Sequence, residues 1–343
     1  MVPVRHNVDL PVVLLHNIDP SWPAVDAEKA LKETSRLASA MIREGHDVSL
    51  APVVDSDIAG PLERFSPDKH IVFNWCESLP GVPHSEALVP EAIESLDFTC
   101  TGSPSGVLAL SEDKRRVKRL LDRADIPTPT WQICKTPADV KGWECFPAIV
   151  KAANEHCSAG LTGDSVVLTA AELRERVVYV IEDLKQPALV EDFIDGREFH
   201  LTIWGNGTIE MLPPTEVNFP ASDSVRDRLC TYDSKFNTFR LRKLRTVISP
   251  PLSEDELRRL EEIGLRSYKL IGCRDYARID VRERDGKFHV LDVNPNADIT
   301  AEDSLALSAK HAGYSYGAMG SHLVSLAAQR HPALGENMQP ASA

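Results

Sequence analysis

The chain has 343 residues, of which 43% are hydrophobic and 26% charged, and its formal net charge is −13. A chain of this length exceeds what one hydrophobic core usually supports, so we expect two or three domains. The negative charge excludes a broadly basic surface for nucleic acid, and no apolar run reaches the roughly 20 residues of a membrane span. It does not exclude a compact phosphate site, which needs only a few lysines and a metal ion.

The seven cysteines are scattered, odd in number and never spaced C-x-x-C. This pattern is not that of a zinc knuckle or a disulfide scaffold, and it is typical of a reduced compartment. The first nine residues also lack the apolar stretch of a secretory signal. We therefore expect a cytoplasmic protein with no membrane partner and no nucleic-acid partner.

Strands and a helix alternate in the first block, for which we predict a domain over residues 1–107. Short apolar runs predict strands at Val12–His16, Val48–Val53 and Ile71–Phe73, and the helical spacing of apolar residues predicts a helix over Asp26–Glu44. This order is typical of a parallel sheet, which binds ligands at the carboxyl ends of its strands.

The second block, residues 108–196, begins after the turn Thr101-Gly102-Ser103-Pro104. We expect a helix from Ser111 to about Ala124. Three strands and a capped helix follow in the sequence, at Ala148–Lys151, Ser165–Leu168, Thr169–Ile181 and Ala188–Glu191.

The third block, residues 197–331, contains two predicted hairpins. Turns at Asn206-Gly207 and Asp285-Gly286 separate runs of strand-forming residues. Between them lie the polar segment 218–246, with weak periodicity, and a helix that a capping box opens at Ser253. Two helices and a disordered tail, 332–343, complete the prediction.

The second hairpin, over residues 276–294, carries the sharpest chemical pattern. Because strand side chains alternate, Asp292 and Asn294 share one face, and Arg278 and Asp280 share a face of the partner strand. The pairing would place two carboxylates and an amide beside an arginine, and such oxygen ligands suit Mg²⁺ together with phosphates. A solvated hairpin face remains the alternative unless phosphate-binding residues lie elsewhere in the chain.

Two lysines are candidates for phosphate binding. Lys151 ends a buried strand just before a loop that contains Ser158 and Gly160, and Lys114 stands in the first turn of a predicted helix. A lysine beside a loop of small residues is a common way to hold phosphate. Considered alone, Lys114 could equally be a surface lysine of the helix.

A strand that ends in Glu191, with Phe193 two residues later, could cover an adenine, and Glu198 could accept hydrogen bonds from a ribose. By themselves these residues indicate only a strand, a turn and a strand.

The order of these segments resembles the ATP-grasp fold and, within it, the D-alanine–D-alanine ligase family, from about Asn74 to Ala328. The motifs similar to those of the family are Thr101-Gly102-Ser103, Asp113-Lys114, Lys151 with the loop 156–160, Val190-Glu191, Gly196-Arg197-Glu198, Ala277-Arg278-Ile279-Asp280 and Asp292-Val293-Asn294.

The resemblance implies an α/β chain of the α+β ATP-grasp type, in which an N-terminal parallel α/β domain precedes two α+β subdomains that sandwich ATP. It implies that a carboxylate attacks the γ-phosphate of ATP and that an amine then displaces phosphate to form an amide. It also implies a homodimer and small-molecule substrates.

The implied roles are distributed over the whole chain. Lys114 and Lys151 would contact phosphates, Glu191 and Phe193 the adenine, and Glu198 the ribose. The ligands of two Mg²⁺ ions, which Mn²⁺ could replace, would be Asp280, Asp292 and Asn294. Arg278, Ser158 and Lys235 would be catalytic, and the substrates would meet Lys235, Ser304, Leu305 and His156.

The departures from the family fall in the half of the site that binds the first substrate. The stretch 14–23 lacks the family's E-H-E-V-S, His156-Cys157-Ser158 replaces G-S-S, and Lys235-Phe236 replaces K-Y. We therefore predict a first substrate other than D-alanine, with an amino-acid-like second substrate. His156 is either a substrate contact or a solvated loop residue, and Glu86 either lines the donor pocket or caps the following helix.

Two alternatives remain open. The same fold could form an ester, a cyclised product or a carbamoyl-type group, or the chain could bind a nucleotide without ligase activity. The presence of Arg278 together with all three metal-ligand candidates argues against the second, because a simple binder needs neither.

Overall fold

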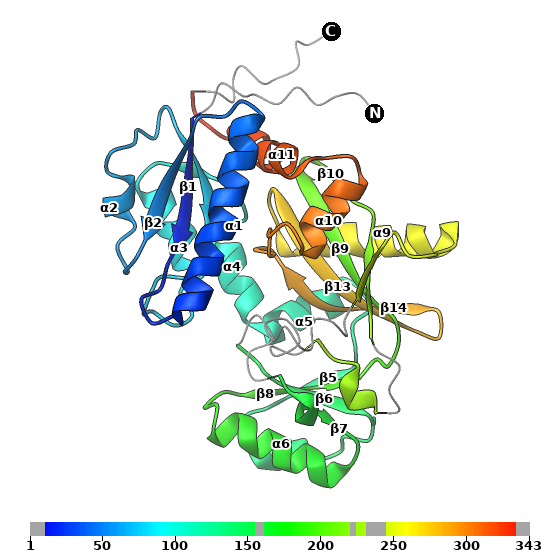
Figure 1. Cartoon of the computed structure of the whole chain (residues 1–343). Helices are drawn as coiled ribbons and strands as arrows, with labels where there is room; N and C mark the ends of the chain where they lie inside the picture. Colours follow the sequence, from blue (N-terminus) through cyan, green and yellow to red (C-terminus); the bar gives the residue numbers. More distant parts are fainter. Residues whose placement is uncertain (1–10, 155–160, 220–223, 231–244, 334–343) are drawn as a thin grey trace.

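The computed structural model describes residues 11–154, 161–219, 224–230 and 245–333. Three sheets follow one another along the chain, and Figure 1 shows the second of them set below the other two. The first sheet is parallel and the other two are antiparallel, which confirms the expected fold class. The domain limits at 107 and 196 stay a prediction. None of the described helices is both long and apolar enough to cross a bilayer.

The first sheet has the strand order β2-β1-β3-β4. Its strands are β1 (Val12–Asn17), β2 (Val48–Val53), β3 (Ile71–Trp75) and β4 (Thr99–Cys100), and its helices are α1 (Ala24–Arg43), α2 (Ala59–Leu62), α3 (Leu88–Ser95) and α4 (Ser105–Glu112). The central strand β1 is buried at all six positions, because a parallel sheet is covered on both faces.

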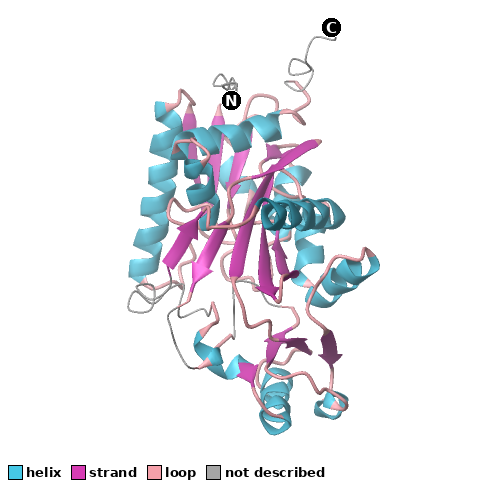
Figure 2. Ribbon diagram, turned by 90° about the vertical axis from the view of Figure 1, so that its right-hand side faces the viewer, coloured by secondary structure: helices cyan, strands magenta, loops and turns pink. Residues whose placement is uncertain are grey.

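The second sheet has the order β5-β8-β6-β7 and lies on one long helix, α6. The elements are β5 (Trp131–Cys134), β6 (Ala148–Ala152), β7 (Val166–Val167), α6 (Ala170–Glu182) and β8 (Ala188–Asp192). The hydroxyl of Thr169 accepts a hydrogen bond from the backbone N–H of Glu172 at 3.2 Å, so the predicted N-cap is confirmed. Figure 2 shows this layer at the lower end of the molecule as well.

The third sheet has the order β12-β11-β9-β13-β14, with β10 paired to β9. The strands are β9 (Glu198–Asn206), β10 (Thr208–Met211), β11 (Thr215–Asn218), β12 (Arg245–Ile248), β13 (Tyr276–Arg284) and β14 (Lys287–Asn294). Helix α9 (Glu254–Ile271) packs on it, with the predicted capping box at Ser253 and Glu256. Both predicted hairpins are confirmed, whereas β11 and β12, which flank the polar segment, were not predicted.

The prediction of one helix from Ser111 to about Ala124 is wrong. Helix α4 ends at Glu112, and a second helix, α5 (Lys114–Arg123), begins after Asp113. The carboxylate of Asp113 accepts the backbone N–H of Arg116 at 3.1 Å and thereby caps α5, while the backbone N–H of Lys114 donates to Ala153 O at 3.1 Å. The break places Lys114 at the start of a helix, directly beside the end of β6.

The last two helices, α10 (Ser304–His311) and α11 (Tyr316–Ala328), confirm the two helices predicted near the end of the chain, whereas the predicted disordered tail lies outside the described residues from 334 on and stays a prediction. Helix α11 packs back on α1 of the first block. A Cβ at Gly317 would lie 2.3 Å from Ala40 O, so this helix contact depends on a residue without a side chain. The first and third sheets therefore share one hydrophobic core, which includes Leu14, Trp204 and Leu323.

Candidate nucleotide and metal site

The hairpin β13–β14 brings together the residues that the sequence predicts, with a β-bulge between Asp280 and Val281. Asp280 lies opposite Asp292, and Arg278 lies opposite Asn294. The guanidinium of Arg278 donates from Nε and Nη2 to the two oxygens of Asp280, at 2.7 and 3.1 Å, and Asn294 Nδ2 donates to the same carboxylate at 3.1 Å. The two carboxylates, the amide and the arginine are thus neighbours.

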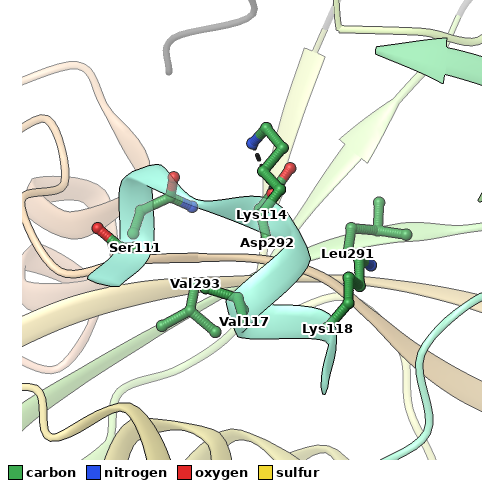
Figure 3. A pocket seen from close by; sticks show the side chains of 8 residues that line it. Ser111, Lys114, Val117, Lys118, Leu291, Asp292 and Val293 are labelled. Carbon is green, nitrogen blue, oxygen red and sulfur yellow. Dashed lines mark hydrogen bonds and ion pairs between the residues drawn. The ribbon is translucent and has the colours of Figure 1, made fainter. Parts of the chain in front are cut away.

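Both predicted phosphate lysines reach this group from other parts of the chain. Lys114 Nζ, at the start of α5, lies 2.8 Å from Asp292 Oδ1, a contact that Figure 3 shows as a dashed line across the small pocket beneath α5. Lys151 Nζ, on β6, lies 3.9 Å from Asp292 Oδ2 and 2.8 Å from Glu191 Oε2. Three elements therefore bring two cations to one carboxylate of the hairpin.

The charges of this group hold each other in the ionised state. Burial alone raises the pKa of Asp292, but Lys114, Lys151 and Lys118 outweigh it and hold that pKa below its ordinary value. Burial lowers the pKa of Lys151, and Glu191 and Asp292 raise it further than burial lowers it. The group is therefore a cluster of opposite charges, which suits a ligand that carries both phosphate and a divalent cation.

A cleft of about 630 Å³ separates the second and third sheets beside these residues. One part of its wall is apolar and includes Leu161, Phe193 and Ile194. The other part is charged, and its members include Lys151, Arg278, Asp280 and Asp292. A cleft lined by both apolar and charged side chains suits a nucleotide, which carries an apolar base and charged phosphates.

Glu198 lies deeper in this cleft and is 6% exposed. Its Oε2 accepts from Arg282 Nε at 2.7 Å, and the guanidinium of Arg282 also lies over the ring of Phe193, 4.7 Å from its centre. Burial raises the pKa of Glu198, but Arg282 and His200 lower it below its ordinary value. One carboxylate oxygen of Glu198, the residue predicted to contact the ribose, is thus already bound by Arg282.

Comparison with known proteins identifies the family. A family model described as the D-ala D-ala ligase C-terminus matches residues 120–325. The chain belongs to the D-alanine–D-alanine ligase family. This membership confirms the expected class of enzyme, an ATP-grasp ligase that uses ATP and Mg²⁺ to form a C–N bond.

Individual relatives agree with the family model. The chain is 30% identical over 296 residues to a D-alanine–D-alanine ligase of Aquifex aeolicus, covering 85% of this chain and 93% of the relative. It is 29% identical over 300 residues to y4sG of Sinorhizobium fredii, described as uncharacterized, covering 84% of each chain. The crystal structure of a D-alanine–D-alanine ligase from Bacillus anthracis complexed with ATP has the same fold, with a TM-score of 0.71, 18% identity and coverage of 93% of this chain and 96% of that one.

The expected metal ligands pass a test of their chemistry. Asp280, Asp292 and Asn294 offer only oxygen ligands, and Mg²⁺ is commonly held by one or two carboxylates with phosphate oxygens completing its shell. Arg278 and Lys114 currently lie against the two carboxylates. Within the described ranges, no group of three or more His, Cys, Asp or Glu is arranged to hold a metal ion without such a phosphate.

Two residues predicted to contact a substrate, Ser304 and Leu305, differ in whether their side chains reach the cleft. Ser304 begins α10, and its hydroxyl lies 2.8 Å from His200 Nδ1, next to the cleft. The side chain of Leu305 has no exposure and packs in the shared core, so a contact between that side chain and a substrate is ruled out and only its backbone could take part. The reason is that α10 turns its apolar face toward the core, which the S-L motif alone does not indicate.

Glu86 does not cap the following helix, and its place in the donor pocket stays a prediction. Helix α3 begins without a side-chain cap, whereas Glu86 Oε1 accepts from Asn296 Nδ2 at 2.8 Å, two residues beyond the metal-ligand candidate Asn294. Burial raises the pKa of Glu86 to about 7, although the bond from Asn296 opposes this shift. Glu86 is therefore a carboxylate that can carry a proton near neutral pH.

Three predicted residues, His156, Ser158 and Lys235, lie outside the described residues, as does Cys157. Their roles stay predictions, and so do the homodimer and the cytoplasmic location.

Sequence reasoning missed three residues that the structure brings into the site. Lys118 lies one helical turn after Lys114. Arg282 follows Asp280 by two residues on β13, so the two side chains share one face of that strand, and the same holds for His200 and Glu198 on β9. These three residues could therefore have been predicted from their spacing, which is four residues from Lys114 on a helix and two residues from a candidate on a strand. His200 pairs with Asp280, and Arg282 pairs with Glu198, across β9 and β13.

Proposed function

We propose that this ligase joins a carboxylate other than D-alanine, activated as an acyl phosphate, to the amine of an amino-acid-like acceptor. The observation that carries the proposal is the junction of Lys114, Lys151 and the β13–β14 hairpin at Asp292. A junction of this kind places lysines for phosphate, carboxylates for a cation and an arginine for developing charge within one cluster.

The nucleotide would occupy the cleft between the second and third sheets. Phe193 and the backbone after Glu191 would cover the adenine in the apolar part. Glu198 would accept from the ribose with its Oε1, which lies 3.5 Å from His200 Nε2. Lys151, and Lys114 from the other side of Asp292, would contact the phosphates.

Asp280, Asp292 and Asn294 would hold Mg²⁺, which neutralises negative charge on the phosphate oxygens. Phosphate oxygens would then compete with Asp280 for Arg278 and with Asp292 for Lys114. The charge balance is kept, because each displaced cation turns from a carboxylate to a phosphate.

The chemistry has two steps. A carboxylate oxygen of the donor attacks the γ-phosphorus, the bond to ADP breaks and an acyl phosphate forms. The acceptor nitrogen then attacks the acyl carbon, phosphate leaves and the nitrogen loses a proton, which gives the amide. Arg278, fixed by Asp280, would stabilise the negative charge that develops in both steps. Ser158 would cover the phosphates, and Lys235 would meet the carboxylate of the acceptor.

Two features support a donor other than D-alanine. The stretch after β1 has no E-H-E-V-S motif, and the buried residues His16 and Asn17 end this strand instead. Asn17 Oδ1 accepts from the backbone N–H of Glu77, which ties this end of the first sheet to the chain that leads to Glu86. The donor pocket is thus built from different side chains than the family motif provides.

A screen of substrate pairs tests the proposal. The protein is incubated with ATP, Mg²⁺ and pairs of carboxylates and amino acids, phosphate release is recorded, and mass spectrometry identifies the products. We expect phosphate release that depends on both members of a pair and an amide whose mass is their sum less water. An ester or a cyclised product would replace the proposed bond, while tight ATP binding without turnover by any pair would favour a nucleotide-binding protein without ligase activity.

A further inference from the structure

Lys118 is a lysine of α5 that is only 1% exposed. Its Nζ lies 2.6 Å from Glu191 Oε1 and donates to Thr128 Oγ1 at 2.7 Å and to Val290 O at 3.3 Å. The ammonium group is thus held by two hydrogen bonds and by an ion pair with Glu191. Burial lowers the pKa of Lys118 further than the neighbouring Glu191 raises it, so the carboxylate opposes the loss of charge that burial favours.

The same carboxylate has a second lysine on its other oxygen. Lys151 Nζ lies 2.8 Å from Glu191 Oε2, and Glu191 is itself 1% exposed. The two lysines differ in what they face, because Lys151 lines the large cleft whereas Lys118 lies on the small pocket beneath α5 with Lys114. Only one of the two is therefore placed to meet a ligand in the cleft.

This arrangement raises a question of charge balance. For Lys151 to bind a phosphate, its ammonium has to turn away from Glu191. A buried carboxylate that loses its only cation is strongly destabilised, so Lys151 would stay on Glu191 if it were the sole partner. Glu191 keeps a partner in Lys118, which hydrogen bonds to Thr128 and Val290 hold in place.

We propose that Lys118 is a positioning residue that holds Glu191 paired and so releases Lys151 to bind a nucleotide phosphate. The inference rests on the proposed function, in which Lys151 contacts phosphate. Lys118 does not touch the nucleotide in this account, and it acts only through Glu191. The contribution of the phosphates to affinity then depends on Lys118, while the binding of adenosine does not.

The test compares the affinities of Mg²⁺·AMP-PNP and adenosine by calorimetry in the wild type and in Lys118→Met. We expect the affinity for AMP-PNP to fall at least about tenfold, the equivalent of about 1.4 kcal/mol, and that for adenosine to stay within about twofold. Lys69→Met removes the same charge at an exposed position of the first block and serves as the matched control, with no change expected. Equal AMP-PNP affinity in Lys118→Met and wild type overturns the inference.

A second substitution separates positioning from a general loss of structure. In Lys118→Met/Glu191→Gln the carboxylate of Glu191 no longer retains Lys151, so the ratio of AMP-PNP to adenosine affinity should recover most of the loss. A double variant that binds AMP-PNP as weakly as the single variant contradicts the inference.

If Lys118→Met does not fold, a structure of the wild type with Mg²⁺·AMP-PNP decides, because Lys151 must then contact a phosphate and Lys118 must contact Glu191. Lys151 still paired with Glu191 beside bound nucleotide overturns the inference, whereas no nucleotide binding by the wild type overturns the proposed function instead.

Discussion

Asp280 and Asp292 lie directly opposite each other across β13 and β14, and each is paired with a cation, Arg278 or Lys114. Two carboxylates at this separation would repel each other without such partners. A divalent cation would bridge the same two groups, which makes this pair the centre of the proposed site.

The first prediction concerns the metal ligand Asp292. In Asp292→Asn the side chain keeps its shape and loses its charge, so the cation is held by one carboxylate fewer, and kcat/KM for ATP-dependent phosphate release should fall at least about 100-fold. Asp285→Asn is the matched control, because it removes the same charge from the exposed turn of the same hairpin. Turnover by Asp292→Asn within threefold of the control would show that the metal assignment is wrong.

Much of this hairpin was predictable from the sequence, and the reason is local. The alternation of residues over 276–294 and the turn at Asp285-Gly286 predicted the hairpin and its candidate ligands. The exact pairing was not predictable, because a β-bulge between Asp280 and Val281 shifts the register by one residue and thereby places Asp292, not Leu291, opposite Asp280. The order of the segments likewise predicted which family the chain resembles.

What could not be predicted depends on contacts between distant segments. The break at Asp113 is fixed partly by Ala153, which directly follows β6. The burial of Lys118 is decided by Glu191 and Val290, which come from β8 and β14. A lysine on a helix otherwise reads as exposed. The shared core of the first and third sheets has the same cause, since α11 returns to α1 from almost the other end of the chain.

The second prediction concerns the arginine of the hairpin. Arg278 contacts Asp280 through two nitrogens and lies 3.6 Å from Asp303 through a third, a fork that lysine cannot reproduce. Arg278→Lys should lower kcat about 100-fold and change KM for ATP less than threefold, because the arginine acts on charge that develops in the transition state. Steady-state kinetics with ATP as the varied substrate measures both constants. A change confined to KM would place Arg278 in ground-state binding instead.

The third prediction concerns the close approach of Gly196 to the hairpin. A Cβ at this position would lie 1.8 Å from Glu283 O, so Gly196→Ala forces the backbone apart and should lower the free energy of unfolding by about 1–3 kcal/mol. Gly106→Ala is the matched control, because a Cβ there meets nothing within 4 Å and the residue lies in α4, where alanine favours the helix. Urea unfolding of both variants measures the difference, and equal stabilities would contradict the packing described.

The fourth prediction is a pH dependence. Burial raises the pKa of Glu86 from 4.5 to about 7, so between these values the folded chain holds a proton that the unfolded chain has released. This group therefore lowers stability as the pH rises through that window, and the loss is complete above pH 7. Glu86→Gln removes the loss and keeps an acceptor for Asn296, so its melting temperature should rise relative to wild type between pH 5 and pH 8. Glu91→Gln is the control on the exposed face of α3, and its melting temperature should not rise relative to wild type over this pH range. If the melting temperatures of Glu86→Gln and wild type change in parallel with pH, the raised pKa of Glu86 is contradicted.

The central claim is that the donor carboxylate is activated by the γ-phosphate. Its most direct test uses a donor from the substrate screen whose two carboxylate oxygens are ¹⁸O. An acyl phosphate requires one of these oxygens to leave with phosphate when the amine attacks. The account predicts one ¹⁸O atom in each phosphate released, as measured by mass spectrometry, whereas phosphate without ¹⁸O would contradict it.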